Sequence, residues 1–83
     1  MQGNAAPSDR LAHIVTDVLR VPRDGIADDL DMETTSTWDS LSHMELIAAI
    51  EDEFGVALTA DEIVSMRSLG AIKGVLRAKS IAL

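Results

Sequence analysis

Asp39, Ser40 and His43 supply the three side-chain types of a hydrolytic triad at neighbouring positions. A triad needs a base oriented by an independent group and an oxyanion hole, whereas a serine and a histidine on one helical turn are tied only by local geometry. The flanking residues also lack the Gly-x-Ser-x-Gly pattern of a nucleophile elbow. We therefore expect His43 to face the core with its ring satisfied by loop backbone. A small hydrolase that uses Ser40 is kept as an alternative.

Asp29, Asp31 and Glu33 follow the spacing of the first ligands in an EF-hand loop. The glycine position of such a loop is occupied by Thr34, and its bidentate glutamate position is occupied by Ser40. Both positions are needed for the sharp turn and for the last two ligand oxygens. We predict no metal site.

Ser40 also lies at the start of an acidic, amphipathic segment that is expected to be helical. Helix N-termini present unpaired N–H groups and the positive end of the macrodipole, so a phosphate esterified to the Ser40 hydroxyl would be held favourably. Alternatively, Ser40 merely occupies a first helical turn, where serine is common. The local pattern leaves both interpretations open.

Apolar residues recur at helical spacing in four segments, which predicts three longer helices and one short third helix. Each segment follows a capping residue or opens with a capping box; these residues are Ser8, Asp39, Thr59 and Ser68. The first helix ends before Pro22, and Gly55 suits the left-handed residue after the second. Gly70 and Gly74 weaken the last helix by about 1 kcal/mol each relative to alanine. No strand of useful length is predicted.

Between the first two helices, residues 21–37 lack a periodic pattern. Structureless loops longer than about 12 to 15 residues are uncommon in small domains and are often functional, and this one leads to Ser40. The positions expected to face the core are Leu11, Ile14, Val15, Val18, Leu19, Ile26, Leu30, Met32, Leu46, Ile47, Ile50, Phe54, Val56, Leu58, Ile63, Val64, Met66, Leu69, Ile72, Val75 and Leu76.

The second helix is predicted to be apolar on two sides. Opposite its core face lie Leu41, Met44 and Ala48, which we call the outward strip. Its acidic borders are formed by Glu45, Glu51 and Asp52. Scattered surface hydrophobes are normal in proteins. We favour a docking surface, because the strip begins beside Ser40.

The chain has 83 residues, enough for one domain. We expect a flexible N-terminus over residues 1–7, a folded domain over 8–79 and a tail over 80–83. Residues 24–62 hold twelve of the fourteen acidic residues and none of the seven basic ones. This field repels nucleic acid and steers basic protein surfaces towards the middle of the chain.

The absence of cysteine excludes disulfides and thiolate metal sites, so thiol chemistry would need an added group. No apolar run approaches the roughly 20 residues of a membrane span. Residues 1–7 lack the form of a signal peptide. We expect a cytoplasmic protein without a membrane partner.

Asp39-Ser40-Leu41, followed by Glu45-Leu46 and by Ile50-Glu51-Asp52-Glu53-Phe54, resembles the acyl carrier protein family. The resemblance extends over roughly residues 8–79 and includes the helix order, the long first loop and the acidic second helix. It implies an all-α four-helix bundle that is not an enzyme and is a monomer. It also implies that a phosphopantetheinyl transferase attaches 4′-phosphopantetheine from coenzyme A to Ser40.

In this family, acyl groups travel as thioesters on that arm between separate enzymes whose basic patches dock on the acidic second helix. By position in the motif, the docking face would comprise Asp39, Leu41, Met44, Glu45, Glu51 and Asp52. Whether cargo enters the bundle is left open by the sequence.

Trp38 and Ser42 depart from the pattern of fatty-acid carriers. Those carriers often have a small residue at the position of Trp38 and an acidic residue at the position of Ser42. The form Thr-Trp-Asp-Ser-Leu resembles discrete carriers of specialised pathways, such as polyketide-type, sugar-linked or amino-acid-loading systems. We therefore expect such a pathway rather than primary fatty-acid synthesis. A peptidyl or aminoacyl carrier and an unmodified helical adaptor for a basic partner are the alternatives.

Overall fold

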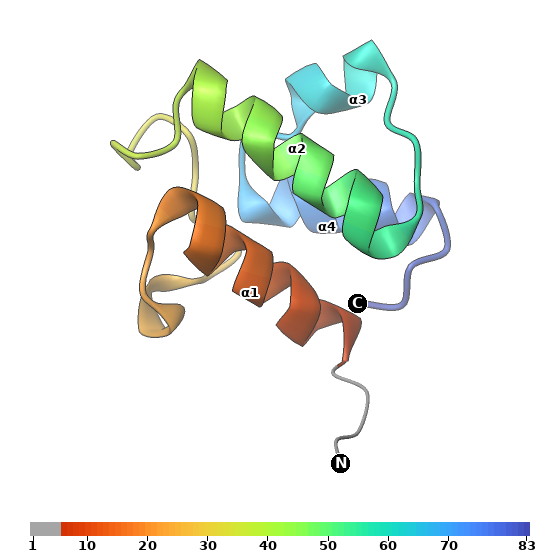
Figure 1. Ribbon diagram of the computed structural model, residues 1–83, viewed down its shortest axis with the longest axis horizontal. Helices are drawn as coiled ribbons and strands as arrows, with labels where there is room; N and C mark the ends of the chain where they lie inside the picture. Colours follow the sequence, from red (N-terminus) through yellow and green to blue (C-terminus); the bar gives the residue numbers. More distant parts are fainter. Residues whose placement is uncertain (1–5) are drawn as a thin grey trace.

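The computed structural model describes residues 6–83, which fold into four α-helices and one short 3-10 helix (Figure 1). The elements are α1 (Pro7–Leu19), η1 (Arg23–Gly25), α2 (Ser40–Phe54), α3 (Ala60–Ser65) and α4 (Leu69–Ala78). Within residues 6–83 the only β-type pairing is one isolated bridge between Asp31 and Ser68. The predicted all-α fold with a short third helix is confirmed. No helix of this part of the chain has the length and apolarity needed to cross a bilayer.

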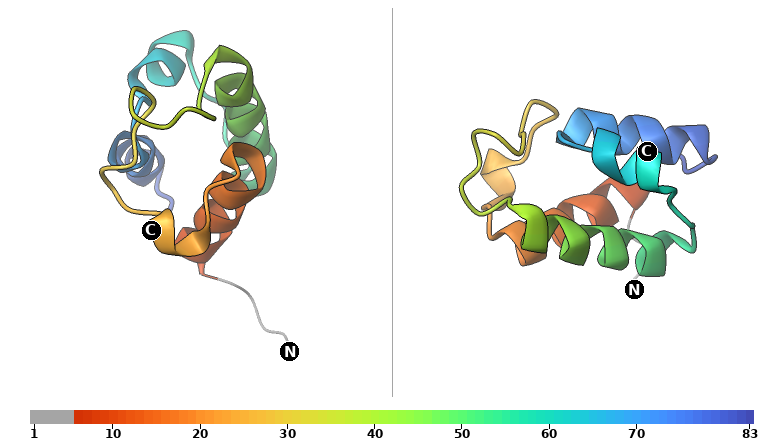
Figure 2. Two further views of the ribbon diagram at one scale, coloured as in Figure 1. Left: turned by 90° about the vertical axis from the view of Figure 1, so that its left-hand side faces the viewer. Right: turned by 90° about the horizontal axis from the view of Figure 1, so that it is seen from above.

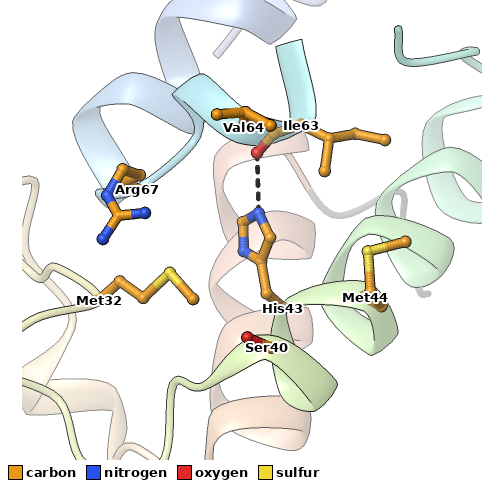
Figure 3. Close-up of a pocket in the computed structure, with 7 residues that line it drawn as sticks. All are labelled: Met32, Ser40, His43, Met44, Ile63, Val64 and Arg67. Atoms are coloured by element: carbon orange, nitrogen blue, oxygen red, sulfur yellow. Dashed lines mark hydrogen bonds between the residues drawn. The ribbon is translucent and has the colours of Figure 1, made fainter. Parts of the chain in front are cut away.

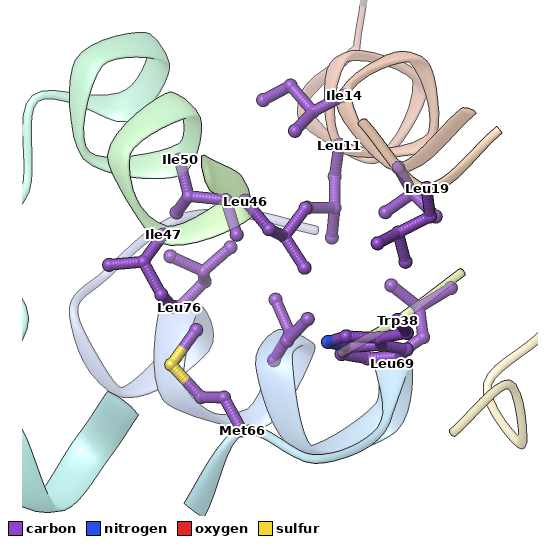
Figure 4. Close-up of a cluster of buried hydrophobic side chains, with 12 residues drawn as sticks. Leu11, Ile14, Leu19, Trp38, Leu46, Ile47, Ile50, Met66, Leu69 and Leu76 are labelled. Carbon is purple, nitrogen blue, oxygen red and sulfur yellow. The ribbon is translucent and has the colours of Figure 1, made fainter. Parts of the chain in front are cut away.

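Buried side chains of the helices form one apolar core. Figure 2 shows the arrangement of the helices from the side and from above. Residues spaced three and four apart place one apolar face of α1, α2 and α4 inwards. Two further core residues, Trp38 and Met66, come from the segments that precede α2 and α4. Figure 4 shows this cluster, whose buried members are Leu11, Ile14, Val15, Leu19, Trp38, Leu46, Ile47, Ile50, Met66, Leu69, Ile72 and Leu76.

Three of the four predicted caps are confirmed. Asp39 accepts the Ser42 N–H, Thr59 and Glu62 form a capping box, and the Ser68 side chain accepts the Ala71 N–H. The first turns of α2, α3 and α4 are thus capped by the residues that the sequence pattern indicated.

The predicted cap of α1 is wrong, because the helix begins at Pro7 and its N-cap is Ala6 rather than Ser8. Proline suits the first helical position, since its φ is already helical and its missing N–H would have no helical partner there. Pro7 therefore belongs to α1 and not to a flexible lead-in. Residues 1–5, the rest of that predicted lead-in, lie outside the described residues.

The long segment between α1 and α2 is pinned to the connection between α3 and α4. The Met32 N–H donates to the Arg67 carbonyl, and the Leu69 N–H donates to the Leu30 carbonyl, each at 2.9 Å. These backbone bonds lie on both sides of the Asp31–Ser68 bridge. The segment is therefore an ordered wall of the bundle, although its sequence shows no periodicity.

Gly70 and Gly74 are predicted to respond differently to alanine. A Cβ at Gly70 would lie 3.2 Å from the Asp28 carbonyl oxygen, which accepts the Gly70 N–H, whereas a Cβ at Gly74 would meet nothing within 4 Å. We expect Gly74→Ala to raise the free energy of unfolding by about 0.5–1 kcal/mol through helix propensity. Gly70→Ala should gain nothing. Urea denaturation followed by circular dichroism measures both; equal stabilisation would contradict the close approach at Gly70.

Candidate functional site

The start of α2 is fixed by a reciprocal capping box that leaves Ser40 free. Asp39 Oδ1 accepts the Ser42 N–H, and Ser42 Oγ accepts the Asp39 N–H, each at 2.9 Å. Ser42 Oγ also donates to the Thr37 carbonyl at 2.7 Å, and the Ser42 side chain is buried. Ser40, the first residue of α2, is exposed. Of the two serines on this turn, only Ser40 offers a hydroxyl to a partner.

The capping bonds also favour the charged form of Asp39 at the N-terminus of α2. The hydrogen bond from the Ser42 N–H is the main reason that the pKa of the Asp39 carboxyl lies below its usual value. Asp39 therefore remains ionised at neutral pH, one residue before Ser40. The Ser42 N–H is one of the first-turn groups that were expected to favour a phosphate at Ser40. It already donates to the Asp39 carboxylate.

His43 lies beside Ser40 at the centre of a buried hydrogen-bond chain. Trp38 Nε1–H donates to His43 Nδ1 at 3.0 Å, and His43 Nε2 lies 2.9 Å from the Ile63 carbonyl oxygen. Since a carbonyl only accepts, Nε2 carries the proton. The prediction of a core-facing histidine satisfied by backbone is confirmed, with the carbonyl coming from α3 instead of the loop.

Both ring nitrogens of His43 are thus occupied, and neither points a free lone pair at Ser40. A hydrolase that uses Ser40 would lack its general base. The same bonds tie the segment before α2 to α3, a helix in which no residue is fully buried. The Trp38–His43–Ile63 chain therefore connects α3 to the start of α2.

A pocket of about 260 Å³ opens beside Ser40, between α2, α3 and the long loop (Figure 3). We call it the Ser40 pocket; its lining residues are Met32, Ser40, His43, Met44, Ile63, Val64 and Arg67. The lining is largely apolar, and Arg67 is its single charged side chain.

Met32, Val64 and Arg67 were not predicted as site residues. Each comes from a different segment, and no local pattern in the sequence marks their meeting. Val64 was predicted to face the core, but its side chain is 69% exposed. Consecutive residues lie about 100° apart around a helix, so α3 packs Ile63 against the core and leaves Val64 outside.

The outward strip of α2 lies on the surface as predicted. Leu41 is 72% exposed and Met44 is 54% exposed, and Ala48 is also exposed. Val64 adds a large exposed apolar side chain from α3 on the other side of the Ser40 pocket. The exposed apolar surface therefore spans two helices.

Two of the acidic residues that border this strip, Glu45 and Asp52, are exposed. The third, Glu51, is only partly exposed, and its Oε2 accepts the Leu58 N–H at 2.9 Å. Glu51 therefore holds the connection between α2 and α3 and is not the free surface charge that its spacing suggested.

Comparison with known proteins places this geometry in context. Residues 9–76 match the family described as "Phosphopantetheine attachment site". An acyl carrier protein of Acidothermus cellulolyticus is 33% identical over 66 residues, covering 72% of this chain and 71% of that protein. An acyl carrier protein of Saccharopolyspora erythraea is 25% identical over 64 residues, covering 77% of this chain and 67% of that protein.

Proposed function

Because the chain belongs to the acyl carrier protein family, we propose that Ser40 is the residue to which its 4′-phosphopantetheine is attached. Carriers of this family hold the group covalently and are not enzymes. The observation that carries the proposal is the exposed Ser40 hydroxyl at the start of α2, beside an open pocket. When bound, the group supplies the terminal thiol on which acyl groups are carried as thioesters, and the chain has no cysteine of its own.

Attachment requires that Ser40 Oγ bonds to phosphorus of coenzyme A while the nucleotide part leaves. The hydroxyl proton must go to a base. His43 has both nitrogens occupied, and the Asp39 carboxylate is held by the Ser42 N–H. We infer that the transferase provides the base, and that this chain contributes a hydroxyl in a fixed position.

The test is intact mass after incubation of the wild-type chain with coenzyme A, Mg²⁺ and a broad-specificity phosphopantetheinyl transferase. We expect the mass to rise by one phosphopantetheine. If several transferases add nothing, the proposal fails, and the unmodified adaptor for a basic partner becomes the better interpretation.

We further propose that partner enzymes dock on the outward strip together with Val64, with Asp39, Glu45 and Asp52 facing their basic residues. The exposure of the apolar side chains supports this, and so does the charge of residues 24–62, which contain no lysine or arginine. Apolar contact supplies affinity, and the acidic border steers approach.

Reversal of Glu45 and of Glu51 separates docking from folding. Glu45→Lys should slow the transferase roughly tenfold at low salt, because it repels a basic partner. It should change the free energy of unfolding by less than about 0.5 kcal/mol. Glu51→Lys should instead cost about 1–3 kcal/mol by leaving the Leu58 N–H without its carboxylate. Transferase kinetics and urea denaturation give both quantities; an unchanged rate for Glu45→Lys at low salt would remove Glu45 from the docking face.

For the pathway, we propose a specialised, polyketide-type or related system rather than primary fatty-acid synthesis. Ser42 is accounted for by its capping bonds, so the support comes from Trp38 in the sequence Thr37-Trp38-Asp39-Ser40-Leu41. Loading of the holo protein by a polyketide-type acyltransferase and by a fatty-acid malonyl transferase can be compared directly. Faster loading by the fatty-acid enzyme would reverse this assignment, and loading only by an adenylating enzyme would indicate an aminoacyl carrier.

A further inference from the structure

A phosphodiester on Ser40 would sit in an acidic neighbourhood. The ionised Asp39 precedes Ser40 and already binds the Ser42 N–H. From residue 24 to residue 62 the sequence contains no lysine or arginine. A lysine or arginine that pairs with an added negative charge at this position must therefore come from outside that stretch.

Arg67 is the cation that the fold brings to Ser40. It follows α3 and lines the Ser40 pocket, where it is the single charged side chain. Figure 3 shows its guanidinium above Met32, on the opposite side of His43 from Met44, in the pocket that Ser40 also lines. Its backbone is held in place, because its carbonyl accepts the Met32 N–H at 2.9 Å and its N–H donates to the Ser65 carbonyl at 2.9 Å.

Within residues 6–83, Arg67 takes part in none of the ion pairs, which engage Arg10, Arg23, Lys73 and Lys79. The charge of Arg67 acts on Asp31. The pKa of Asp31 is lowered chiefly by hydrogen bonds from Thr34, and the charge of Arg67 makes the smallest contribution. The Asp31 carboxylate is thus satisfied by the N–H and hydroxyl of Thr34. The Arg67 guanidinium is left exposed for another anion.

We propose that Arg67 is the positioning residue that pairs with the phosphodiester on Ser40 and directs the first part of the arm across the Ser40 pocket. This inference rests on the proposed attachment at Ser40. Arginine is suited to the role, since its planar guanidinium binds phosphate oxygens through two parallel hydrogen bonds.

The experiment compares apo and holo protein by NMR. In ¹⁵N-labelled wild type at low salt, the Arg67 Nε–Hε signal should move on conversion to the holo form. Its exchange with water should slow by about two- to fivefold, the range of an exposed ion pair. Both effects should shrink at about 0.5 M salt, where the Debye length is only a few ångströms.

The matched variants are Arg67→Gln, Arg67→Lys and Arg77→Gln. Arg77 is an exposed arginine on α4 that does not line the Ser40 pocket. The ³¹P signal of the holo protein should shift in Arg67→Gln, shift less in Arg67→Lys and stay unchanged in Arg77→Gln. Wild-type behaviour in Arg67→Gln would overturn the inference.

The outcomes separate this inference from the function on which it depends. Without a gain of mass in the wild type, attachment itself fails. If the mass rises while the Arg67 signal stays where it was in the apo protein, attachment stands and the phosphate contact is wrong. If the signal moves only after loading with a carboxylated acyl group such as malonyl, the phosphodiester assignment is overturned and Arg67 binds the cargo carboxylate instead.

Discussion

Replacement of Ser40 by alanine is expected to abolish phosphopantetheine attachment completely, with almost no change in stability. Ser40 is exposed at the first position of α2, where alanine is a good helix former. The bonds that fix this helix start belong to Asp39 and Ser42 and do not involve the Ser40 side chain. Intact mass after treatment with transferase and coenzyme A should show the unmodified chain, and the helical circular dichroism signal should remain.

Ser42→Ala is the matched control, since Ser42 lies on the same helical turn. It removes the hydroxyl that accepts the Asp39 N–H and donates to the Thr37 carbonyl. The cost in stability should be about 1–2 kcal/mol, as for other lost caps. The folded variant should still accept one phosphopantetheine. If Ser40→Ala is still modified, or if only Ser42→Ala loses the modification, then Ser40 is not the attachment site.

Replacement of Trp38 by alanine should be the most destabilising change in the site. The indole is 2% exposed and belongs to the core, so its removal should cost about 3–5 kcal/mol. It also leaves His43 Nδ1 without its donor. Domains of this kind are typically stable by only about 5–15 kcal/mol, so the variant is expected to be partly unfolded. Urea denaturation followed by circular dichroism measures the loss, because the chain has no other tryptophan to report by fluorescence.

Trp38→Phe isolates the hydrogen bond. It keeps most of the ring, and the unpaired Nδ1 of His43 should then cost about 1–3 kcal/mol. Leu41→Ala, at the exposed start of the outward strip, should stay within about 0.5 kcal/mol of wild type. If Trp38→Phe is as stable as wild type, the bond between Trp38 and His43 makes no net contribution to the fold.

Ser40 and Trp38 show how one short motif serves two purposes. Ser40 faces outwards and carries the proposed chemistry, whereas Trp38 faces inwards and is joined through His43 to the carbonyl of Ile63. The wall of the Ser40 pocket that α3 provides is therefore anchored by the residue two positions before the proposed attachment site. A change at Trp38 should affect the pocket as well as the stability.

The sequence by itself determined the helices, most of their caps and Ser40 as the candidate. These features are local: apolar spacing fixes which face of a helix is buried, and Asp39, Thr59 and Ser68 each accept from an N–H group three residues away. The acidic middle of the chain was equally readable, since charge is a property of composition. The first cap was wrong by two residues, because Pro7 can start a helix without a side-chain bond.

Only the tertiary structure decided which residues surround Ser40. Val64 and Arg67 are far from Ser40 in sequence, and Met32 lies in the long loop, which has no periodic pattern. Backbone bonds between this loop and the α3–α4 connection bring Met32 and Arg67 together. The same holds for Glu51, whose spacing places it at the surface but whose carboxylate is taken by the Leu58 N–H. Periodicity reports how a helix turns. It carries no information about which distant backbone groups will reach its side chains, since those contacts form only when the bundle packs.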